Sequence, residues 1–391
     1  MLISDIILIC SIFLIAYNYI VYPILLIALN KIIKNPYSKD YNFKPNITFI
    51  IAAHNEEELI GGAINSILAS DYTQDKIKIL VGSDGSTDRT DDILEEYQQM
   101  LNGKLQYFKY TRSGKNKVLN DLLPKSDTDI VLFMDADCRV SSNTISEMVA
   151  NFFDDNIACV IASQSVESEN NDNNAGKLGD TAYHRYEQVI RELESNIHSN
   201  VNSLGYLYAV KKIYLKPIPN DFVCDDLHNV YSIIEYKKRV IFEKNAQAKE
   251  IRKKSFSNEL HRRVRAVAGG IATMVEFSHL ANIFKYGIVS FFLISHKVFR
   301  WLSPFFIMLL IFLTFTFWNS SYLWLVLFYG QLLFYFVALL GWIADRLNIN
   351  IKFAKICLFV ISMNYSSLLG TIRYLKKSQN AIWDRIGFSG D

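Results

Sequence analysis

The stretch ITFIIAAHNEE, residues 47–57, contains the two features from which the fold can be inferred. Residues 47–53 form a continuous apolar run, which is typical of a strand that is buried on both faces of a parallel sheet. The polar residues His54 to Glu57 then lead into an amphipathic helix that we expect near 58–70. A buried strand that is followed by a turn and a helix is the unit from which α/β domains are built.

The same alternation continues downstream. Strands are expected at 77–82, 105–110, 129–134 and 157–163, and helices at about 89–101 and 142–153. This spacing predicts an α/β fold with a parallel-rich, doubly wound sheet. Ligands of such sheets bind at the carboxyl ends of the strands. His54, Asp84 and Asp137 all fall at strand ends, so we expect one cleft to contain them.

Three acidic clusters mark the chemistry of the chain. They read SDGSTD at 83–88, MDADC at 134–138 and CDDL at 224–227. The first two follow apolar runs, and the third lies in a polar stretch far downstream. A nucleotide-sugar enzyme needs acids for three tasks: binding the base or ribose, holding a divalent cation on the diphosphate, and deprotonating an acceptor.

Composition narrows the class of protein. The chain has 391 residues, half of them hydrophobic, and a net charge of +2, so no nucleic-acid partner is implied. The five cysteines show neither metal-ligand spacing nor a disulfide framework, which fits a reducing cytosolic site.

Two long uncharged regions indicate a membrane protein. Residues 6–30 and 301–344 carry no charge, and apolar runs of this length read as spanning helices. The first run lacks a basic leader and a small-residue cleavage site, so residues 1–34 are expected to be a retained transmembrane anchor. Lysines follow it, which places the domain at 44–280 in the cytoplasm, within a multi-pass protein of the cell (inner, cytoplasmic) membrane; they are Lys31, Lys34, Lys39 and Lys44.

The C-terminal part is expected to hold further membrane segments. Residues 281–300 contain a short apolar run between charges, which predicts an amphipathic helix in the interface. Transmembrane segments are expected within 301–375, with clear spans at 302–318 and 322–343. The run 356–372 is either re-entrant or a third span. A basic tail, 376–391, completes the chain.

Six motifs in a fixed order resemble the inverting family 2 glycosyltransferases, in particular the membrane-bound members that make bacterial surface polysaccharides. The resemblance covers roughly residues 47–270 and implies a GT-A nucleotide-binding domain flanked by transmembrane helices and an interface helix. The motifs are AAHNEE at 52–57, SDGSTD at 83–88, SGKNKVLN at 113–120, DADC at 135–138, CDD at 224–226 and RRVRAVAGG at 262–270.

The resemblance also assigns donor-binding roles. It implies a Mg²⁺ or Mn²⁺ ion bound chiefly by Asp137, with Asp135 near the metal or the ribose. A hard cation of this kind neutralises charge on the leaving diphosphate. The nucleotide-binding residues that it implies are Ala53, His54, Glu56, Asp84, Lys115 and Asp135. Lys115 follows Gly114, and a lysine suits a phosphate as a point charge.

Acceptor chemistry is assigned to the downstream motifs. Asp226 is the expected general base, and Asp225 stands where the family has a glutamate. Processive relatives carry Q-x-x-R-W where this chain has Arg262, Arg263 and Arg265, and Ala266 replaces the tryptophan. Asp225, Arg262 and Arg265 are therefore predicted to contact the acceptor or the diphosphate. Alternatively, these arginines face anionic lipid.

The implied activity is inverting transfer of a sugar from a nucleotide-diphosphate donor, with UDP the expected nucleotide. The acceptor is a lipid-linked sugar or a saccharide, and the expected partners are membrane lipids and polysaccharide-assembly proteins. The alternative is a processive synthase that extrudes its polymer, which needs more spanning helices and is weakened by Ala266. The intact DAD and CDD motifs argue against a silent scaffold, and the absence of ionisable residues in the clear spans argues against a transporter.

Overall fold

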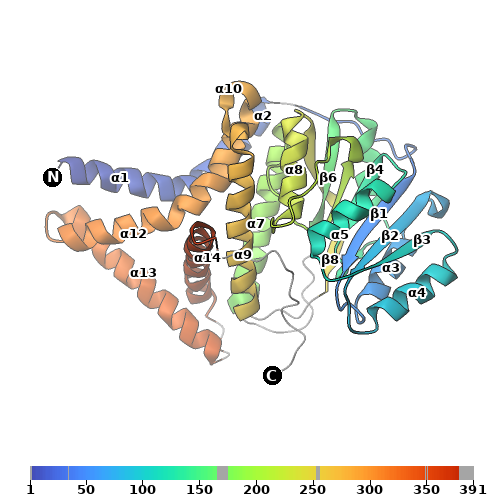
Figure 1. Cartoon of the computed structure of the whole chain (residues 1–391). Coiled ribbons are helices and arrows are strands. Elements are labelled where there is room, and N and C mark those ends of the chain that lie inside the picture. Colours follow the sequence, from blue (N-terminus) through green and yellow to red (C-terminus); the bar gives the residue numbers. More distant parts are fainter. Residues whose placement is uncertain are drawn as a thin grey trace.

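A computed structural model describes residues 2–33, 35–164, 175–251, 256–347, 349 and 351–377. An α/β domain occupies one side of the molecule, and a group of long apolar helices occupies the other (Figure 1). From residue 378 onward, the predicted basic tail lies outside the described residues.

The α/β domain is built on one eight-stranded sheet. Its order is β3-β2-β1-β4-β7-β6-β8-β5. The strands β1 to β4 are mutually parallel, as predicted, whereas β7 runs antiparallel between β4 and β6, so the sheet is mixed. The strands are β1 (Ile47–Ala53), β2 (Ile77–Asp84), β3 (Leu105–Tyr110), β4 (Ile130–Met134), β5 (Cys138–Val140), β6 (Ile157–Gln164), β7 (Leu207–Lys211) and β8 (Arg239–Glu250).

Helices cover both faces of this sheet, so two apolar cores form. Alternate residues of β1 divide between them: Phe49 and Ile51 enter one core, and Ile50 and Ala52 enter the other. The first core is closed by α3 (Ile60–Leu68), α4 (Thr90–Met100) and α6 (Thr144–Val149). The second is closed by α5 (Lys115–Leu122), α7 (Ala175–Ile197) and α8 (Asp225–Glu235).

Four helical segments are long and apolar enough to cross a membrane: Ile3–Ile32, Ile288–Phe317, Tyr322–Arg346 and Lys352–Leu375. The first consists of α1 (Leu2–Ala16), the π-helix η1 (Tyr17–Val21) and α2 (Tyr22–Ile32). The second consists of α11 (Ile288–Phe292), the π-helix η7 (Leu293–Val298) and α12 (Phe299–Phe317), and it follows the short helix α10 (Ile283–Tyr286). No break occurs at residue 300, so the division into an interface helix at 281–300 and a following span stays a prediction.

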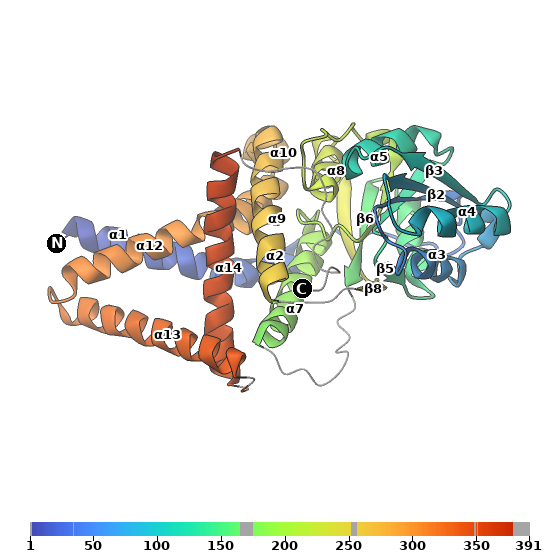
Figure 2. The same cartoon turned by 60° about the horizontal axis from the view of Figure 1, so that its bottom comes forward.

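The last apolar helix runs across the others. The remaining two apolar segments are α13 (Tyr322–Arg346) and α14 (Lys352–Leu375). Figure 1 shows α14 end-on while α1 and α12 run sideways, and Figure 2 shows α14 lengthwise beside α9 (Phe256–Glu276). Gly370 allows close contact, because a Cβ there would lie 2.9 Å from the carbonyl oxygen of Val264 in α9. α14 therefore connects the other apolar helices to α9, which packs beside the α/β domain.

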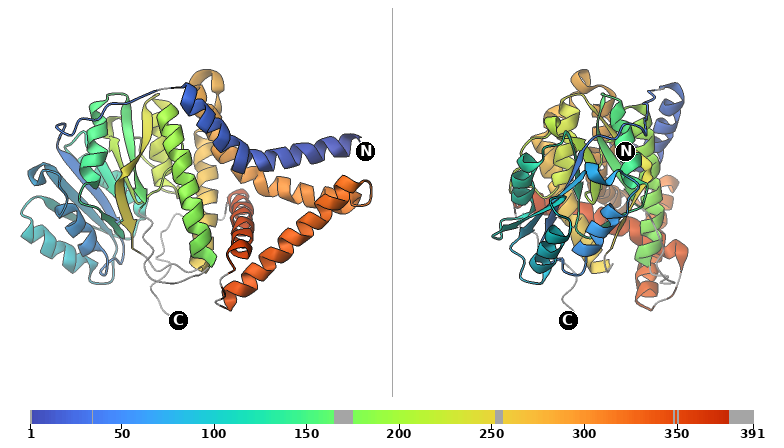
Figure 3. Two further views of the ribbon diagram at one scale, coloured as in Figure 1. Left: turned by 180° about the vertical axis from the view of Figure 1, so that it is seen from behind. Right: turned by 90° about the vertical axis from the view of Figure 1, so that its right-hand side faces the viewer.

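The two π-helical turns meet each other. The Tyr17 hydroxyl in η1 lies 2.7 Å from the Ser295 hydroxyl in η7, and the Asn18 side chain donates to the Phe299 carbonyl at 2.9 Å. A π turn widens the helix and commonly bends it. Both apolar segments bend at this level before they continue toward the α/β domain (Figure 3).

The close packing of α5 on the sheet gives a stability prediction. A Cβ on Gly82 in β2 would overlap the Val118 side chain of α5, whereas a Cβ on Gly61 in α3 would find its nearest atom, the Tyr97 hydroxyl, at 3.4 Å. Gly82→Ala should cost about 1–3 kcal/mol of unfolding free energy through overpacking. Gly61→Ala, the matched control, should be neutral or stabilising. Thermal unfolding in detergent measures both, and equal stability of the two variants would contradict the packing account.

Candidate functional site

The turns that follow β1 and β2 interlock. His54 Nδ1 lies 2.8 Å from the Asp84 carbonyl oxygen, and the Glu56 amide donates to the Thr90 hydroxyl at 2.7 Å. Ala53 is fully buried, with its side chain in the core, so only its backbone faces this edge. The first two motifs therefore share one edge of the sheet, and nucleotide contact by Ala53, His54 and Glu56 stays a prediction.

Asp84 organises the loop before α5. Its carboxylate is fully buried and accepts hydrogen bonds from the Ser113 amide (2.6 Å) and hydroxyl (3.1 Å), from the Gly114 amide (2.9 Å) and from Arg112 Nη1 (2.7 Å). A carboxylate offers about four acceptor positions, and these bonds use them. In this conformation Asp84 positions the loop. Its predicted contact with the nucleotide is untested, and sequence reasoning missed Arg112, whose main signal is its place beside the SGK motif.

Lys115 connects three of the motifs. Its Nζ lies 2.9 Å from Asp135 Oδ1 and 3.2 Å from Asp225 Oδ1, and it follows Gly114, which adopts a φ of +95°. Burial lowers the pKa of Lys115, but Asp135 and Asp225 raise it by more, so the side chain remains a cation. The SGK, DAD and CDD segments, far apart in sequence, thus meet at one ammonium group.

Asp225 is a buried acid of this site whose pKa is raised. Burial raises its pKa to about 6, with Lys115 acting in the opposite direction and Asp226 and Asp135 adding to the rise. Its Oδ2 atom is buried without a hydrogen-bond partner among the described residues. Strongly shifted acids in a cluster of this kind are typical of functional sites.

Asp226 occupies the first turn of α8. The sequence placed the CDD cluster only in a polar stretch, whereas the structure makes it the start of a helix. Carboxylates are stabilised there by the helix dipole. Asp226 Oδ2 accepts a hydrogen bond from the Gly205 amide at 2.8 Å, and the side chain is partly exposed. The carboxylate is thus oriented by the backbone and remains partly accessible from outside.

Asp135 and Asp137 lie on the turn that leaves β4. The Asp135 amide donates to the Tyr206 carbonyl at 3.0 Å, and the Ile251 amide donates to the Asp137 carbonyl at 2.8 Å, so backbone contacts fix both residues. Within the described part of the chain, no group of three or more acidic, histidine or cysteine side chains forms a metal cage. Mg²⁺ commonly binds through one or two carboxylates together with substrate phosphates. Asp135 and Asp137 fit that kind of shared site.

Two asparagines of α5, which the sequence reasoning missed, hold a loop of the candidate site in place. Asn116 donates to the carbonyls of Pro219 (2.9 Å) and Phe222 (2.7 Å), and Asn120 exchanges two hydrogen bonds with Ile218. Both therefore fix the loop that precedes the CDD motif. Their signal was available in SGKNKVLN, because residues four apart share one helix face.

The predicted arginines of α9 lie in different surroundings. The pKa of the Cys224 thiol is raised by burial and by the charges of Asp226 and Asp225. The positive charges of Lys297 and Arg265 lower this pKa, so Arg265 lies near Cys224 at the start of α8. Arg263 lies over the Phe359 ring of α14 at 4.9 Å, and Arg262 is exposed. Arg265 is thereby brought near the acidic cluster, and contact of either Arg262 or Arg265 with a diphosphate stays a prediction.

The role of Asn116 gives a second prediction. Asn116→Ala leaves two loop carbonyls without their partner and should cost about 1–3 kcal/mol of unfolding free energy. Exchange of the backbone amide hydrogens at residues 220–225 should rise. Lys117→Ala on the same helix is the control, because it removes only the exposed ion pair with Asp121. Unchanged exchange in the Asn116 variant would contradict the proposed contact.

Parts of the sequence are similar to known proteins. Residues 48–213 match the family described as "Glycosyl transferase family 2". The chain is 30% identical over 112 residues to the poly(ribitol-phosphate) beta-N-acetylglucosaminyltransferase TarS of Staphylococcus aureus, which is 29% of this chain and 19% of TarS. It is 32% identical over 114 residues to a beta-monoglucosyldiacylglycerol synthase of Synechocystis, which is 28% of this chain and 23% of that enzyme. The chain thus spans about a fifth of the curated relatives that it matches.

One solved structure resembles the chain over nearly its whole length. It is the mannosyltransferase PcManGT from Pyrobaculum calidifontis, in complex with GDP-mannose and Mn²⁺. The TM-score is 0.74 at 18% identity, with 96% of this chain and 100% of that chain covered. The predicted α/β GT-A fold with long apolar helices is thereby confirmed.

Proposed function

We propose that this chain, whose residues 48–213 carry the glycosyl transferase family 2 signature, transfers a sugar from a nucleotide-diphosphate donor to a lipid-linked or saccharide acceptor, with inversion at the anomeric carbon. The observation that carries this proposal is the double contact of Lys115. One cation joins Asp135 of the DAD turn to Asp225 beside the general base. Donor and acceptor groups can therefore react in one place.

In the proposed reaction the acceptor hydroxyl attacks the anomeric carbon while Asp226 takes its proton. The bond from that carbon to the diphosphate oxygen breaks, and the nucleoside diphosphate leaves. The hydrogen bond from Gly205 orients the Asp226 carboxylate for the proton transfer. Lys115 and Arg265 supply positive charge for the departing phosphates.

A divalent cation fits the carboxylates of this site. Asp137 and Asp135 would bind Mg²⁺ or Mn²⁺ together with the donor phosphates, and the ion would stabilise the charge that develops on the leaving group. Lys115 already neutralises Asp135 on one side. Donor binding would change this contact, because the phosphates need the same ammonium group.

The proposed setting is the cytoplasmic face of the cell membrane, with a cell-surface polysaccharide or glycolipid as product. Four helices of sufficient length and hydropathy support membrane association. The crossed arrangement suggests that α1, α12 and α13 span while α14 lies along the surface, next to α9 (Figure 2). The predicted UDP donor and polysaccharide-assembly partners belong to this proposal.

Substitution of the base tests the reaction. Asp226→Asn should lower transfer by roughly two to four orders of magnitude, the usual contribution of a general base. Binding of the nucleoside diphosphate should persist. Asp221→Asn, an exposed acid of the preceding loop, is the matched control and should retain activity. The measurement is nucleoside diphosphate release from a panel of donors, and an active Asp226 variant would refute the assigned role.

Removal of divalent ions tests the carboxylate pair. Transfer should fall to background after EDTA treatment and return on addition of Mg²⁺ or Mn²⁺. Asp137→Ala should require far more metal for the same rate, because one of the two protein ligands is lost. Full activity in EDTA would exclude this part of the proposal.

A further inference from the structure

A second charged cluster lies buried between α7 and the η7–α12 junction. It contains the cations Arg191, Lys297 and Arg300 and the carboxylates Glu187 and Glu194. Within the described residues, the cluster therefore contains three cations and two carboxylates. This count leaves out His296, which lies between the two carboxylates. Buried charge is costly unless it is paired, so the excess positive charge calls for an anion.

The carboxylates of this cluster are already engaged. Glu194 accepts hydrogen bonds from the Tyr22 hydroxyl (2.6 Å) and His296 Nδ1 (2.7 Å). Glu187 contacts His296 Nε2 (3.2 Å), Arg300 Nη1 and the Asn202 amide (3.3 Å). Little acceptor capacity remains for the other guanidinium donors.

Several guanidinium donors are left without partners. Arg191 is only 4% exposed, and its Nε and Nη1 atoms have no hydrogen-bond partner among the described residues. Its Nη2 atom lies 3.6 Å from Glu187. The Nε and Nη2 atoms of Arg300 are buried and unpartnered as well. Guanidinium groups bind phosphate oxygens through paired N–H donors, so a phosphate would satisfy these atoms.

The cluster is one loop away from the proposed general base. Lys297 donates to the Asn202 side chain, and the same loop reaches Gly205, whose amide binds Asp226. The Lys297 charge also acts on the thiol of Cys224, two residues before Asp226. A phosphate bound here would place an attached sugar or polyol within range of the reaction.

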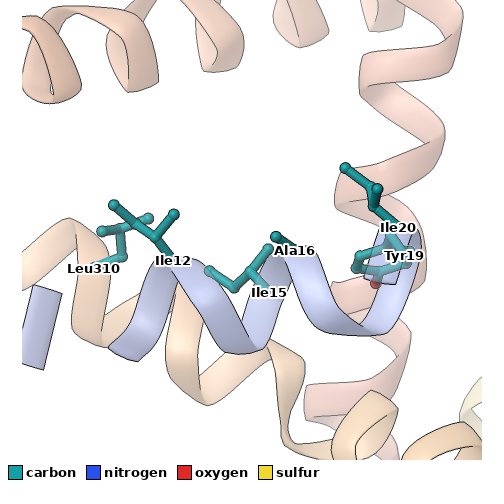
Figure 4. Close-up of a pocket in the computed structure, with 6 residues that line it drawn as sticks. All are labelled: Ile12, Ile15, Ala16, Tyr19, Ile20 and Leu310. Carbon is teal, nitrogen blue, oxygen red and sulfur yellow. The ribbon is translucent and has the colours of Figure 1, made fainter. Parts of the chain in front are cut away.

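An apolar groove lies along α1 and η1, and η1 contacts α7 beside the cluster. It has a volume of about 290 Å³ and is lined by Ile12, Ile15, Ala16, Tyr19, Ile20 and Leu310. Figure 4 shows five of these side chains along one side of the α1–η1 helix, with Leu310 of α12 beside Ile12. The carbonyl of Tyr19, one of the lining residues, accepts a hydrogen bond from the Tyr186 hydroxyl (3.3 Å), and Tyr186 directly precedes Glu187.

We propose that Arg191, Lys297 and Arg300 bind the phosphate of a lipid acceptor whose hydrocarbon chain lies in the groove of α1 and α12. This inference rests on the proposed glycosyl transfer and adds the acceptor class: a lipid phosphate or diphosphate rather than an uncharged lipid. The excess positive charge and the unpaired guanidinium donors favour a phosphate as the bound group. The apolar groove favours a lipid as the molecule that bears this phosphate.

Binding can be tested without turnover. The full chain carrying Asp226→Asn is placed in uncharged detergent and titrated with polyprenyl phosphate or with polyprenol of the same chain length. Thermal stabilisation is expected with polyprenyl phosphate alone. Lys297→Gln should weaken it about tenfold or more, as expected when a charged hydrogen bond is lost. Lys285→Gln, at an exposed lysine of α10, should leave it unchanged.

Each alternative outcome overturns the inference. Equal stabilisation by polyprenol would show that only the chain is recognised. Stabilisation by inorganic phosphate or pyrophosphate that equals that by polyprenyl phosphate and is weakened by Lys297→Gln would assign the cluster to a free anion. Stabilisation by UDP or GDP is expected from the donor site, and its weakening by Lys297→Gln would assign the cluster to the donor. Lys297 is only partly buried, so its variant remains informative if Arg191→Gln fails to fold.

The outcome is separable from that of the proposed function. If the proposed glycosyl transfer is wrong, the unmodified chain will release no nucleoside diphosphate, whether or not it binds the lipid. If transfer occurs, the acceptor preference gives a second readout. Lys297→Gln should raise the KM for the phosphorylated acceptor about tenfold or more, with a smaller change in kcat.

Discussion

The contact of one ammonium group with two carboxylates is the constraint on which the arrangement of the site depends. Lys115 can reach Asp135 and Asp225 only because α5 begins directly above the end of β2 and because α8 begins opposite the turn after β4. The first condition depends on Gly82, which lets α5 approach the sheet, and on Asp84, which shapes the loop before α5. The second depends on Asn116 and Asn120, which bind the loop before α8. Packing and polar contacts thus converge on one cation.

Much of the fold follows from short-range patterns in the sequence. The parallel strands β1, β2 and β4 were predictable because each is a compact apolar run that ends in a polar turn. The strand β8 was not, because its twelve residues include charged and polar side chains that read as surface, and its partner β6 lies far away in sequence. The antiparallel insertion of β7 likewise depends on tertiary pairing, which local periodicity does not encode.

The candidate site shows the same division. Motif order brought Asp84, Lys115, Asp135, Asp225 and Asp226 to attention, and the structure joins them through hydrogen bonds, ion pairs and short loops. The sequence could not reveal which of these acids uses its hydrogen-bond acceptor positions to stabilise the structure and which remains accessible. Asp84 has its acceptor positions filled by its own loop, whereas Asp226 has one backbone donor and an accessible face. The second charged cluster was equally hard to predict, because Lys297 and Arg300 belong to the segment predicted as an interface helix, whereas Arg191 lies far upstream in α7.

The pairing of the first and last parts of the chain has a consequence for biosynthesis. The Trp324 indole donates a hydrogen bond to the Asp5 carboxylate at 2.9 Å, although 319 residues separate them. The contact between Tyr17 of η1 and Ser295 of η7 likewise joins segments that are far apart in sequence. Domains generally form in order as the chain is synthesised. In the proposed membrane setting, the amino-terminal helix therefore enters the lipid before Trp324 is synthesised, and Asp5 lacks this partner while the ribosome completes the whole α/β domain. Quality-control factors that recognise polar groups in isolated membrane helices have that interval in which to engage it.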